Sequence, residues 1–373
     1  MAVSEGLDKK IHRLKGVRNS RVIDASRYND PEFQEREIEG IFQRSWLVAG
    51  PARWLQKAGD YFCLNEMGES IVLLCDQDGV LRAFHNICRH RGTRLLDGRG
   101  NIGAIRCPYH DWKYSLDGRL RHIPGAKGFA EPIDKPQMGL LPVNVDTALG
   151  FVWINLSENP PALRSTLAGL DQELAHYNLE EMVPIQEKVW ELPHNWKAVL
   201  DNATESYHLL PVHGSSVNPF IGDVPEFTTY EDHYRLTLGI ATYGWRKKVD
   251  EWTSRGGPYT DLEKSALHKY VLFPNFLINV LPYHLTVFQV WPIAPNRSRF
   301  FYGFYMRKGA GLLERARAYA TWMASRYILV EDFDILDRFQ DGANTTRVSK
   351  HRFHDGEIAM DHFHKVLDRR LKR

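Results

Sequence analysis

The sequence predicts an α+β fold, with a small all-β domain followed by a larger domain that combines an antiparallel sheet with helices. Two observations carry this prediction. From about residue 46 to residue 156, short β-rich runs alternate with Gly- and Asp-rich turns, which is typical of an all-β module. Beyond about residue 161 the pattern changes to helix, then long strands, then helix again. The expected domains are therefore residues 1–45, 46–156 and 157–373.

The N-terminal 45 residues are predicted to be helical in part and to pack on the C-terminal domain. In Pro31–Gln43, charged and apolar residues recur at helical spacing. The all-β module that follows has β-rich runs such as Ser70–Leu74 and Gly150–Ile154. Turn residues separate these runs, as at Asp76–Gly79 and Asp117–Gly118.

A boundary between the two larger domains is expected at Ser157–Pro161, because two consecutive prolines interrupt any regular element. Beyond it, apolar periodicity predicts helices and long apolar-aromatic runs predict antiparallel strands. The expected elements are helices over Leu163–Tyr177 and Asn195–His213, strands over Tyr270–Leu281, Tyr283–Ile293 and Arg299–Met306, and helices over Glu314–Phe339 and Ile358–Lys372.

Composition argues against several classes of protein. The formal net charge of +2 gives no electrostatic reason to expect a nucleic-acid partner or an anionic membrane surface. No apolar run reaches the roughly 18 residues of a membrane span, and Met1–Arg21 lacks the apolar core of a signal peptide. Two of the four Cys, Cys63 and Cys75, lie in strand-like runs and are expected to be buried thiols. We therefore expect a cytoplasmic protein.

Two short segments each carry one Cys and one His. Cys88-Arg89-His90 is followed, after 16 residues, by Cys107-Pro108-Tyr109-His110. This arrangement suits a [2Fe–2S] cluster of the Rieske type, in which two thiolates hold one iron and two imidazoles hold the other. Because neutral imidazoles replace anionic thiolates, such a cluster accepts an electron more readily than an all-Cys cluster.

A structural zinc site is the alternative, because two Cys and two His also satisfy tetrahedral zinc. Structural zinc sites usually pair Cys with Cys and His with His along the chain. Here each segment supplies one of each, so the cluster is favoured. Trp112, which follows the second segment, is expected to pack over the cluster and exclude water.

A second site would give the electrons of such a cluster a use. His208 and His213 lie five residues apart, whereas a regular helix favours four, so we expect Pro211 to distort the turn. Two His and one carboxylate form the facial triad of mononuclear non-haem iron, which leaves positions open for O₂. The carboxylate is expected from the late helix, with Asp332 as first choice and Asp334 or Asp337 as alternatives.

With both motifs in place, the chain resembles the catalytic α subunits of the Rieske non-haem iron oxygenases over nearly its whole length. The family's cluster motif, Cys-x-His and then Cys-x-x-His, falls on Cys88, His90, Cys107 and His110. The resemblance implies an N-terminal Rieske [2Fe–2S] domain. It also implies a C-terminal helix-grip catalytic domain, an antiparallel sheet with helices, that binds mononuclear Fe(II).

The family's iron motif is an acid, two residues, His, four residues and a second His. It falls on Glu205, His208 and His213, and the third ligand, in a Glu-Asp…Gln-x-Gly segment, falls on Asp332. In the family the acid is no ligand but bridges a cluster His of one subunit to an iron-ligating His of the next. The resemblance therefore gives Glu205 the role of an inter-subunit electron-transfer bridge and implies a homotrimer.

The identity of the bridging acid bears on the substrate. Ring-hydroxylating dioxygenases mostly have Asp at this position, and Glu205 is similar to the subset that includes carnitine-type monooxygenases. Asp201 and Asn202 lie within about one helical turn of Glu205 and are candidate hydrogen-bonding neighbours of the site. An ordinary role as satisfied helix polar residues is equally compatible with the sequence.

The resemblance also implies partners. A separate reductase or ferredoxin would supply electrons from NADH or NADPH, because the chain has no flavin or nicotinamide motif of its own. O₂ and a small organic substrate would bind beside the iron. The candidate pocket residues come from the segment after His213 and from the predicted strands, and they are Asn218, Phe220, Phe276, Asn279, His284 and Phe288.

Three hypotheses about function remain open at this point. The main one is a terminal oxygenase that hydroxylates an aromatic or aromatic-acid substrate. The alternative is a monooxygenase or demethylase of a carnitine- or betaine-like quaternary ammonium compound, held by cation–π attraction to aromatic side chains. A Rieske electron carrier without catalysis is the remote third, because a carrier does not need the long segment that follows the cluster module. The choice between mono- and dioxygenation is also open.

Overall fold

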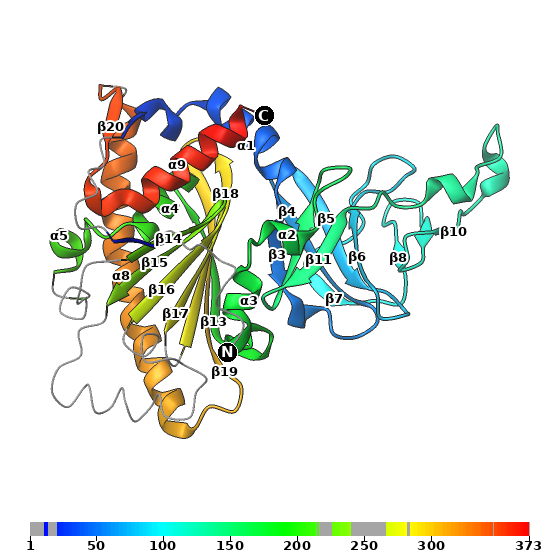
Figure 1. Cartoon of the computed structure of the whole chain (residues 1–373). Helices are drawn as coiled ribbons and strands as arrows, with labels where there is room; N and C mark the ends of the chain where they lie inside the picture. Colours follow the sequence, from blue (N-terminus) through cyan, green and yellow to red (C-terminus); the bar gives the residue numbers. More distant parts are fainter. Residues whose placement is uncertain are drawn as a thin grey trace. The chain divides into compact units, whose positions relative to one another are not determined.

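A computed structural model describes residues 11–13, 21–214, 216, 226–239, 266–281, 284–345 and 347–372. The chain forms two compact units (Figure 1). The smaller unit is Phe42–Leu163, and the larger unit joins Met1–Ile41 to Arg164–Arg373. No helix in the described ranges is both long and apolar enough to cross a bilayer.

The smaller unit is built from three antiparallel sheets. The first has the order β6-β5-β4-β7, the second β11-β12-β3 and the third β10-β9-β8. Their strands are β3 (Leu47–Pro51), β4 (Asp60–Glu66), β5 (Glu69–Cys75), β6 (Leu81–His85), β7 (Arg99–Asn101), β8 (Ile105–Arg106), β9 (Lys113–Tyr114), β10 (Leu120–His122), β11 (Asn144–Ala148) and β12 (Phe151–Asn155). The strands are short because turns close them at positive-φ residues such as Gly79, Gly118 and Gly150.

The larger unit is organised around an eight-stranded antiparallel sheet of order β1-β14-β15-β16-β17-β18-β19-β13. The strands are β1 (Ile11–Arg13), β13 (Met182–Leu192), β14 (Glu226–Tyr230), β15 (His233–Gly239), β16 (Ala266–Leu272), β17 (Phe276–Leu281), β18 (His284–Ala294) and β19 (Arg297–Arg307). A separate two-stranded sheet pairs β2 (Val22–Asp24) with β20 (Lys350–Arg352). Together with the helices below, this confirms the predicted α+β fold.

The helices of the larger unit lie against this sheet. They are α1 (Pro31–Gly40), α3 (Leu170–Leu174), α4 (Trp196–Thr204), α5 (Leu209–His213), α8 (Leu312–Asn344) and α9 (Ile358–Leu371), and α2 (Leu163–Thr166) begins at the boundary of the units. The long α8 runs along one face of the sheet (Figure 1), where Tyr302 hydrogen-bonds Ser325 and Phe300 packs edge-on against Phe333. We call this the α8 face.

The opposite face of the sheet is defined by Tyr270, whose hydroxyl donates to Glu173 of α3 over 3.1 Å. We call it the α3 face. Because side chains alternate along a strand, residues paired with Tyr270 or two positions away belong to the α3 face. Residues at the intervening positions belong to the α8 face. The register of the sheet shows which residues are directly paired and therefore lie on the same face.

Three predicted elements are each divided in the structure. The helix expected over Leu163–Tyr177 is α2 and α3, which are separated before Gly169, whose φ is +87°. The single helix expected over Asn195–His213 is α4 and α5, separated at Glu205, whose backbone is extended (φ −109°, ψ 173°). The Glu205 carboxylate accepts from the backbone N–H groups of Tyr207 and His208, which competes with continuation of the helix. Pro211 therefore does not cause the break. It lies in the first turn of α5, where its missing N–H removes no helical hydrogen bond.

The strand expected over Tyr270–Leu281 is likewise two strands. β16 ends at Leu272 and β17 begins at Phe276, with Pro274 between them. Proline cannot donate to a sheet ladder, so the chain reverses there and β17 pairs antiparallel with β16. Residues paired across this reversal, such as Tyr270 and Ile278, lie on the same face of the sheet.

A buried ion pair joins α1 to α4. Lys197 Nζ donates to Glu37 Oε2 over 2.9 Å, and Trp196 Nε1 donates to the same oxygen over 3.0 Å. Neither charged side chain has any exposed surface. Burial raises the pKa of Glu37 and lowers the pKa of Lys197, and the mutual attraction of the two groups opposes both shifts. The pair holds the N-terminal segment against the helix that leads to Glu205.

Removal of one partner should therefore destabilise the larger unit. Lys197→Met leaves the Glu37 carboxylate buried without its cation, which costs about 3–5 kcal/mol. We expect a lower midpoint of urea unfolding, followed by the fluorescence of tryptophan. Lys188→Met, at an exposed position of β13, is the matched control and should leave the midpoint unchanged. Equal midpoints for the two variants would contradict a stabilising role for the pair.

Candidate active site and cluster-binding loops

The two Cys-His segments form tight loops of the smaller unit. The Cys88 N–H donates to Thr93 O over 2.8 Å, and the Gly92 N–H returns to Cys88 O over 2.9 Å. In the second loop the Cys107 N–H donates to Trp112 O over 2.9 Å. Both thiols are buried, with 2% and 3% of the residue exposed. Each loop thus fixes its Cys by backbone hydrogen bonds within a few residues.

The two imidazoles of these loops lie next to each other, edge to face. The ring centroids of His90 and His110 lie 4.7 Å apart, and His90 stacks on Trp112 at 4.9 Å with an angle of 6° between the rings. Trp112 is 2% exposed, as expected for a side chain that keeps water from this site. His90 Nδ1 is buried and has no hydrogen-bond partner among the described residues. A buried nitrogen without a partner is what an unfilled metal ligand presents.

A tyrosine hydroxyl and the second thiol lie beside Cys88. The Tyr114 hydroxyl lies 3.4 Å from Cys88 Sγ and accepts the Arg89 N–H over 3.1 Å. Burial raises the pKa of the Cys88 thiol, the Tyr114 contact opposes that rise, and the neighbouring Cys107 adds to it. The four side chains do not converge as a single-ion group, whereas another set of described residues does. This separation suits a two-iron cluster better than one zinc ion.

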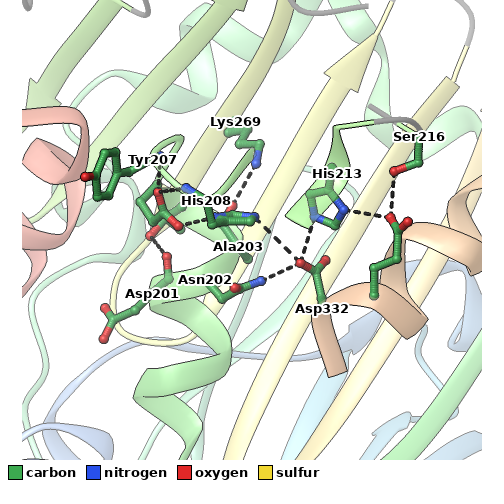
Figure 2. A network of polar contacts seen from close by, with 12 residues as sticks. Asp201, Asn202, Ala203, Tyr207, His208, His213, Ser216, Lys269 and Asp332 are labelled. Carbon is green, nitrogen blue, oxygen red and sulfur yellow. Dashed lines mark hydrogen bonds and ion pairs between the residues drawn. The ribbon is translucent and has the colours of Figure 1, made fainter. Parts of the chain in front are cut away.

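That other set consists of His208, His213 and Asp332 of the larger unit. One ligand atom from each lies within 4.8 Å of the others. Asp332 Oδ1 is 2.9 Å from His213 Nε2 and 3.6 Å from His208 Nε2, and the two rings are 5.2 Å apart (Figure 2). Two imidazole nitrogens and one carboxylate oxygen therefore point at a common centre, which is the donor set of a facial triad.

Each of the two histidines also contacts a second carboxylate through its other ring nitrogen. Glu205 Oε1 contacts His208 Nδ1, and Glu331 Oε2 lies 2.8 Å from His213 Nδ1. Ser216 Oγ donates to the same Glu331 oxygen over 2.6 Å (Figure 2). A carboxylate at Nδ1 favours the tautomer with the proton there, which leaves the Nε2 lone pair free to bind a metal.

The third donor of the triad is held by α4. Asn202 Nδ2 donates to Asp332 Oδ1 over 2.8 Å. Asp201, the other candidate neighbour of the site, points away and accepts from the Tyr28 hydroxyl over 2.8 Å. Asp201 Oδ2 also lies 3.2 Å from His364 Nε2. Asn202 thus contacts the triad directly, and Asp201 anchors the helix that carries it.

The two alternative carboxylates on α8 have other surroundings. Asp334 is exposed, and Asp337 Oδ1 lies 2.7 Å from His194 Nε2. Neither belongs to the group formed with the two histidines. Asp332 differs because it contacts Asn202 of α4, His213 of α5 and His208, which precedes α5.

A cavity of about 380 Å³ is lined in part by Glu205. Glu205 itself is 6% exposed. The residues that line this cavity include Tyr28, Asp201, Asn202, Glu205, His351 and Glu357. Glu205 therefore both lines this cavity and contacts His208, one of the triad residues.

The predicted pocket residues divide between the two faces of the sheet. Asn279, His284 and Phe288 lie on the α8 face, where Phe288 keeps partial exposure and His284 stacks on Phe304 at 4.6 Å. Burial lowers the pKa of His284 to about 3, so this imidazole is neutral. Phe276 pairs with Gln289 and lies on the α3 face, so its expected place with the others is wrong. Asn218 and Phe220 lie outside the described residues.

Sequence reasoning did not identify three of the residues around this site. Glu331 contacts His213 Nδ1, and Ser216 donates to the Glu331 carboxylate. Lys269 Nζ donates to Ala203 O at the end of α4 over 2.9 Å (Figure 2). One signal was available for Lys269, because it is the sole formally charged side chain in the strand sequence Ala266–Leu272. No sequence signal separated Glu331 from a solvent-exposed acid of α8.

Comparison with known families covers both units. The family model described as "Ring hydroxylating alpha subunit (catalytic domain)" matches residues 179–373, and the model described as "Rieske [2Fe-2S] domain" matches residues 45–137. Among curated proteins, the carnitine monooxygenase oxygenase subunit of Escherichia coli (strain K12) is 29% identical over 360 residues, 92% of each chain. The glycine betaine monooxygenase oxygenase subunit of Pseudomonas aeruginosa (strain PAO1) is 37% identical over 304 residues, 73% of this chain and 70% of that one.

Solved structures share the fold. The quaternary ammonium Rieske monooxygenase CntA in complex with L-carnitine has a TM-score of 0.78 and 24% identity, and covers 95% of this chain and 97% of its own. Naphthalene 1,2-dioxygenase from Rhodococcus sp. has a TM-score of 0.76 and 20% identity, and covers 94% of both chains. With its Rieske domain, its catalytic-domain match and these relatives, the chain belongs to the ring-hydroxylating α subunits, the catalytic components of Rieske-type oxygenases.

Proposed function

We propose that this Rieske oxygenase acts on a quaternary ammonium compound, as a monooxygenase that hydroxylates or demethylates it. The observation that carries this proposal is the similarity to carnitine and glycine betaine monooxygenase oxygenase subunits over most of the chain. A chloroplastic choline monooxygenase of Spinacia oleracea is also similar, at 25% identity over 93% of this chain. These names share a trimethylammonium group.

This proposal reverses the order of the two substrate hypotheses drawn from the sequence. An aromatic substrate was expected first, but naphthalene dioxygenase shares the fold at only 20% identity. The aromatic side chains of the α8 face are compatible with either class. Phe288, edge-on to Phe300 and tilted against Tyr302, offers π faces that attract a trimethylammonium group by about 1–2 kcal/mol when desolvated. Glu205 in place of Asp favours the same class.

We assign the mononuclear iron to His208, His213 and Asp332. Iron bound there supplies the redox chemistry of O₂ activation, and the protein supplies binding, orientation and exclusion of water. Glu205 and Glu331 hold the Nδ1 protons of the two imidazoles, and Asn202 holds the carboxylate of Asp332 by its amide. These outer contacts orient all three ligands before the metal arrives, which reduces the cost of binding it.

We further propose that Glu205 carries electrons from a neighbouring subunit. Its carboxylate contacts His208, and the residue also lines the cavity of about 380 Å³. A cluster histidine of a second copy, docked at that cavity, would then be one carboxylate away from an iron ligand. A separate reductase supplies the electrons to the cluster, as in the family to which the chain belongs.

The assignment of the iron ligands predicts a selective loss of metal. Purified wild-type protein should hold about three irons per chain, two in the cluster and one at the triad. Asp332→Ala should hold about two, because the triad loses its anionic ligand while the cluster loops are untouched. Iron analysis together with the visible spectrum of the cluster measures both sites.

The matched control is Asp334→Ala, which removes an exposed carboxylate two residues away on the same helix. It should keep the wild-type iron content. If Asp332→Ala and the wild-type protein hold equal iron after identical reconstitution, the assignment of Asp332 is wrong.

The role of Glu205 predicts two loaded but uncoupled metal sites. Glu205→Ala, reconstituted with excess Fe(II), should keep the cluster spectrum and the mononuclear iron. Turnover should fall by about 10- to 100-fold, because the contact of His208 is lost. Single-turnover reoxidation of the reduced cluster measures the transfer step. Full-rate reoxidation in this variant would contradict the bridging role.

The substrate class is tested by the same reoxidation. Protein with a reduced cluster is mixed with O₂ and, in separate runs, with L-carnitine, glycine betaine, choline, benzoate or naphthalene. We expect rapid reoxidation with at least one quaternary ammonium compound, with one oxygen of the product derived from O₂. Rapid reoxidation with benzoate or naphthalene alone would overturn the proposed substrate class and leave the oxygenase intact.

A further inference from the structure

A row of three hydrogen-bonding side chains crosses the α8 face of the sheet. Lys269 of β16 pairs with Asn279 of β17, and Asn279 pairs with Thr286 of β18. Side chains of directly paired residues share a face, with their Cβ atoms about 5 Å apart. The row ends in apolar residues on both sides, because Leu236 pairs with Lys269 and Phe304 pairs with Thr286. Three adjoining polar groups therefore interrupt an apolar surface.

The middle member of this row has unused hydrogen-bonding capacity. Asn279 is 7% exposed, and its Nδ2 donates to Thr286 Oγ1 over 3.0 Å. Its Oδ1 is buried and has no partner among the described residues. Leaving such a group unsatisfied costs about 1–3 kcal/mol. Since the two ends of the amide can exchange places, Asn279 offers a ligand either an acceptor or a donor.

Lys269 adds a positive charge with unused donors. Its ammonium group has three donors, and the contact found among the described residues is the one to Ala203 O. It forms no ion pair with any carboxylate that the structure describes. Burial lowers the pKa of Lys269, and attraction from Asp332 and Glu205 opposes that shift. The ammonium therefore contacts the end of α4, the helix that carries Asn202, and has no directly paired anion among the described residues.

We propose that Lys269, Asn279 and Thr286 bind the carboxylate of a zwitterionic quaternary ammonium substrate. This inference rests on the proposed function and narrows its substrate class to compounds that carry both charges. The Lys269 ammonium attracts the carboxylate by a charge-assisted hydrogen bond and repels the trimethylammonium group. The row therefore orients the substrate as well as selecting it. Compounds that lack the carboxylate, such as choline, gain no binding affinity from these three residues, and the Lys269 ammonium repels their positive charge.

A purely structural role for Lys269 makes a different prediction. Ala203 O is one of the last carbonyl groups of α4, and a cation at a helix C-terminus stabilises that helix. If Lys269 served only this purpose, its loss would weaken the binding of every substrate alike. If Lys269 binds the substrate's carboxylate, its removal should weaken the binding of substrates that carry a carboxylate and not of those that lack one.

The test uses Lys269→Met in the iron-loaded full chain and the probes glycine betaine, L-carnitine and choline. Dissociation constants come from calorimetry under anaerobic conditions, and KM and kcat from O₂ consumption. The carboxylated probes should bind about 10- to 100-fold more weakly than to the wild type, as expected for loss of a hydrogen bond to a charged group. Choline should bind equally well or more tightly. Lys188→Met, which removes an exposed Lys of β13, should match the wild type for all three probes.

A second variant keeps the proposal testable if Lys269→Met fails to fold. Thr286→Val keeps the shape of the side chain and removes only the hydroxyl, and it should weaken the carboxylated probes selectively by a smaller factor. The inference is overturned if Lys269→Met, with wild-type iron content, binds glycine betaine and L-carnitine as the wild type does. It is also overturned if choline loses affinity by the same factor. If wild-type protein binds none of the three probes, the proposed function itself fails.

Discussion

The contact on which the site depends is the meeting of one carboxylate on α8 with two segments that lie more than one hundred residues earlier in the chain. Asp332 Oδ1 accepts from Asn202 and lies beside the Nε2 atoms of His208 and His213. None of these contacts is local, so the site exists only when the sheet holds α8 against α4 and α5. The buried pair of Lys197 and Glu37 serves the same end, because it fixes the start of α4.

Charge explains why this meeting point suits a metal. Three carboxylates, those of Glu205, Glu331 and Asp332, surround two imidazoles in a small, partly buried volume. Concentrated negative charge is costly without a cation, and a divalent ion at the Nε2 side offsets that cost. The role proposed for Lys269 is also electrostatic. Its ammonium has no paired carboxylate among the described residues and would attract the carboxylate of a substrate, while the metal site would bind O₂.

Much of this chemistry was predictable from local sequence, and the exceptions have physical causes. The cluster residues and the two histidines could be proposed from the sequence, because their motifs lie within short segments such as Cys88-Arg89-His90 and Glu205–His213 and because the two motifs occur together. The break at Glu205 was not predictable, because its carboxylate accepts backbone N–H groups that a helix would use. The face of each strand residue depends on register. Phe276 and Asn279 lie three residues apart in β17 and therefore on opposite faces, and the row that begins at Lys269 depends on the pairing of β16 with β17 and of β17 with β18.

We propose that His208, His213 and Asp332 hold one iron and that Cys88, His90, Cys107 and His110 hold two. Anomalous diffraction at the iron edge, from crystals of iron-loaded protein, tests both parts in one map. We expect a single peak bounded by the two Nε2 atoms and the Asp332 carboxylate, and a paired peak between the loops of the smaller unit. Absence of a peak at the triad, or a lone zinc signal between the loops, would contradict the account.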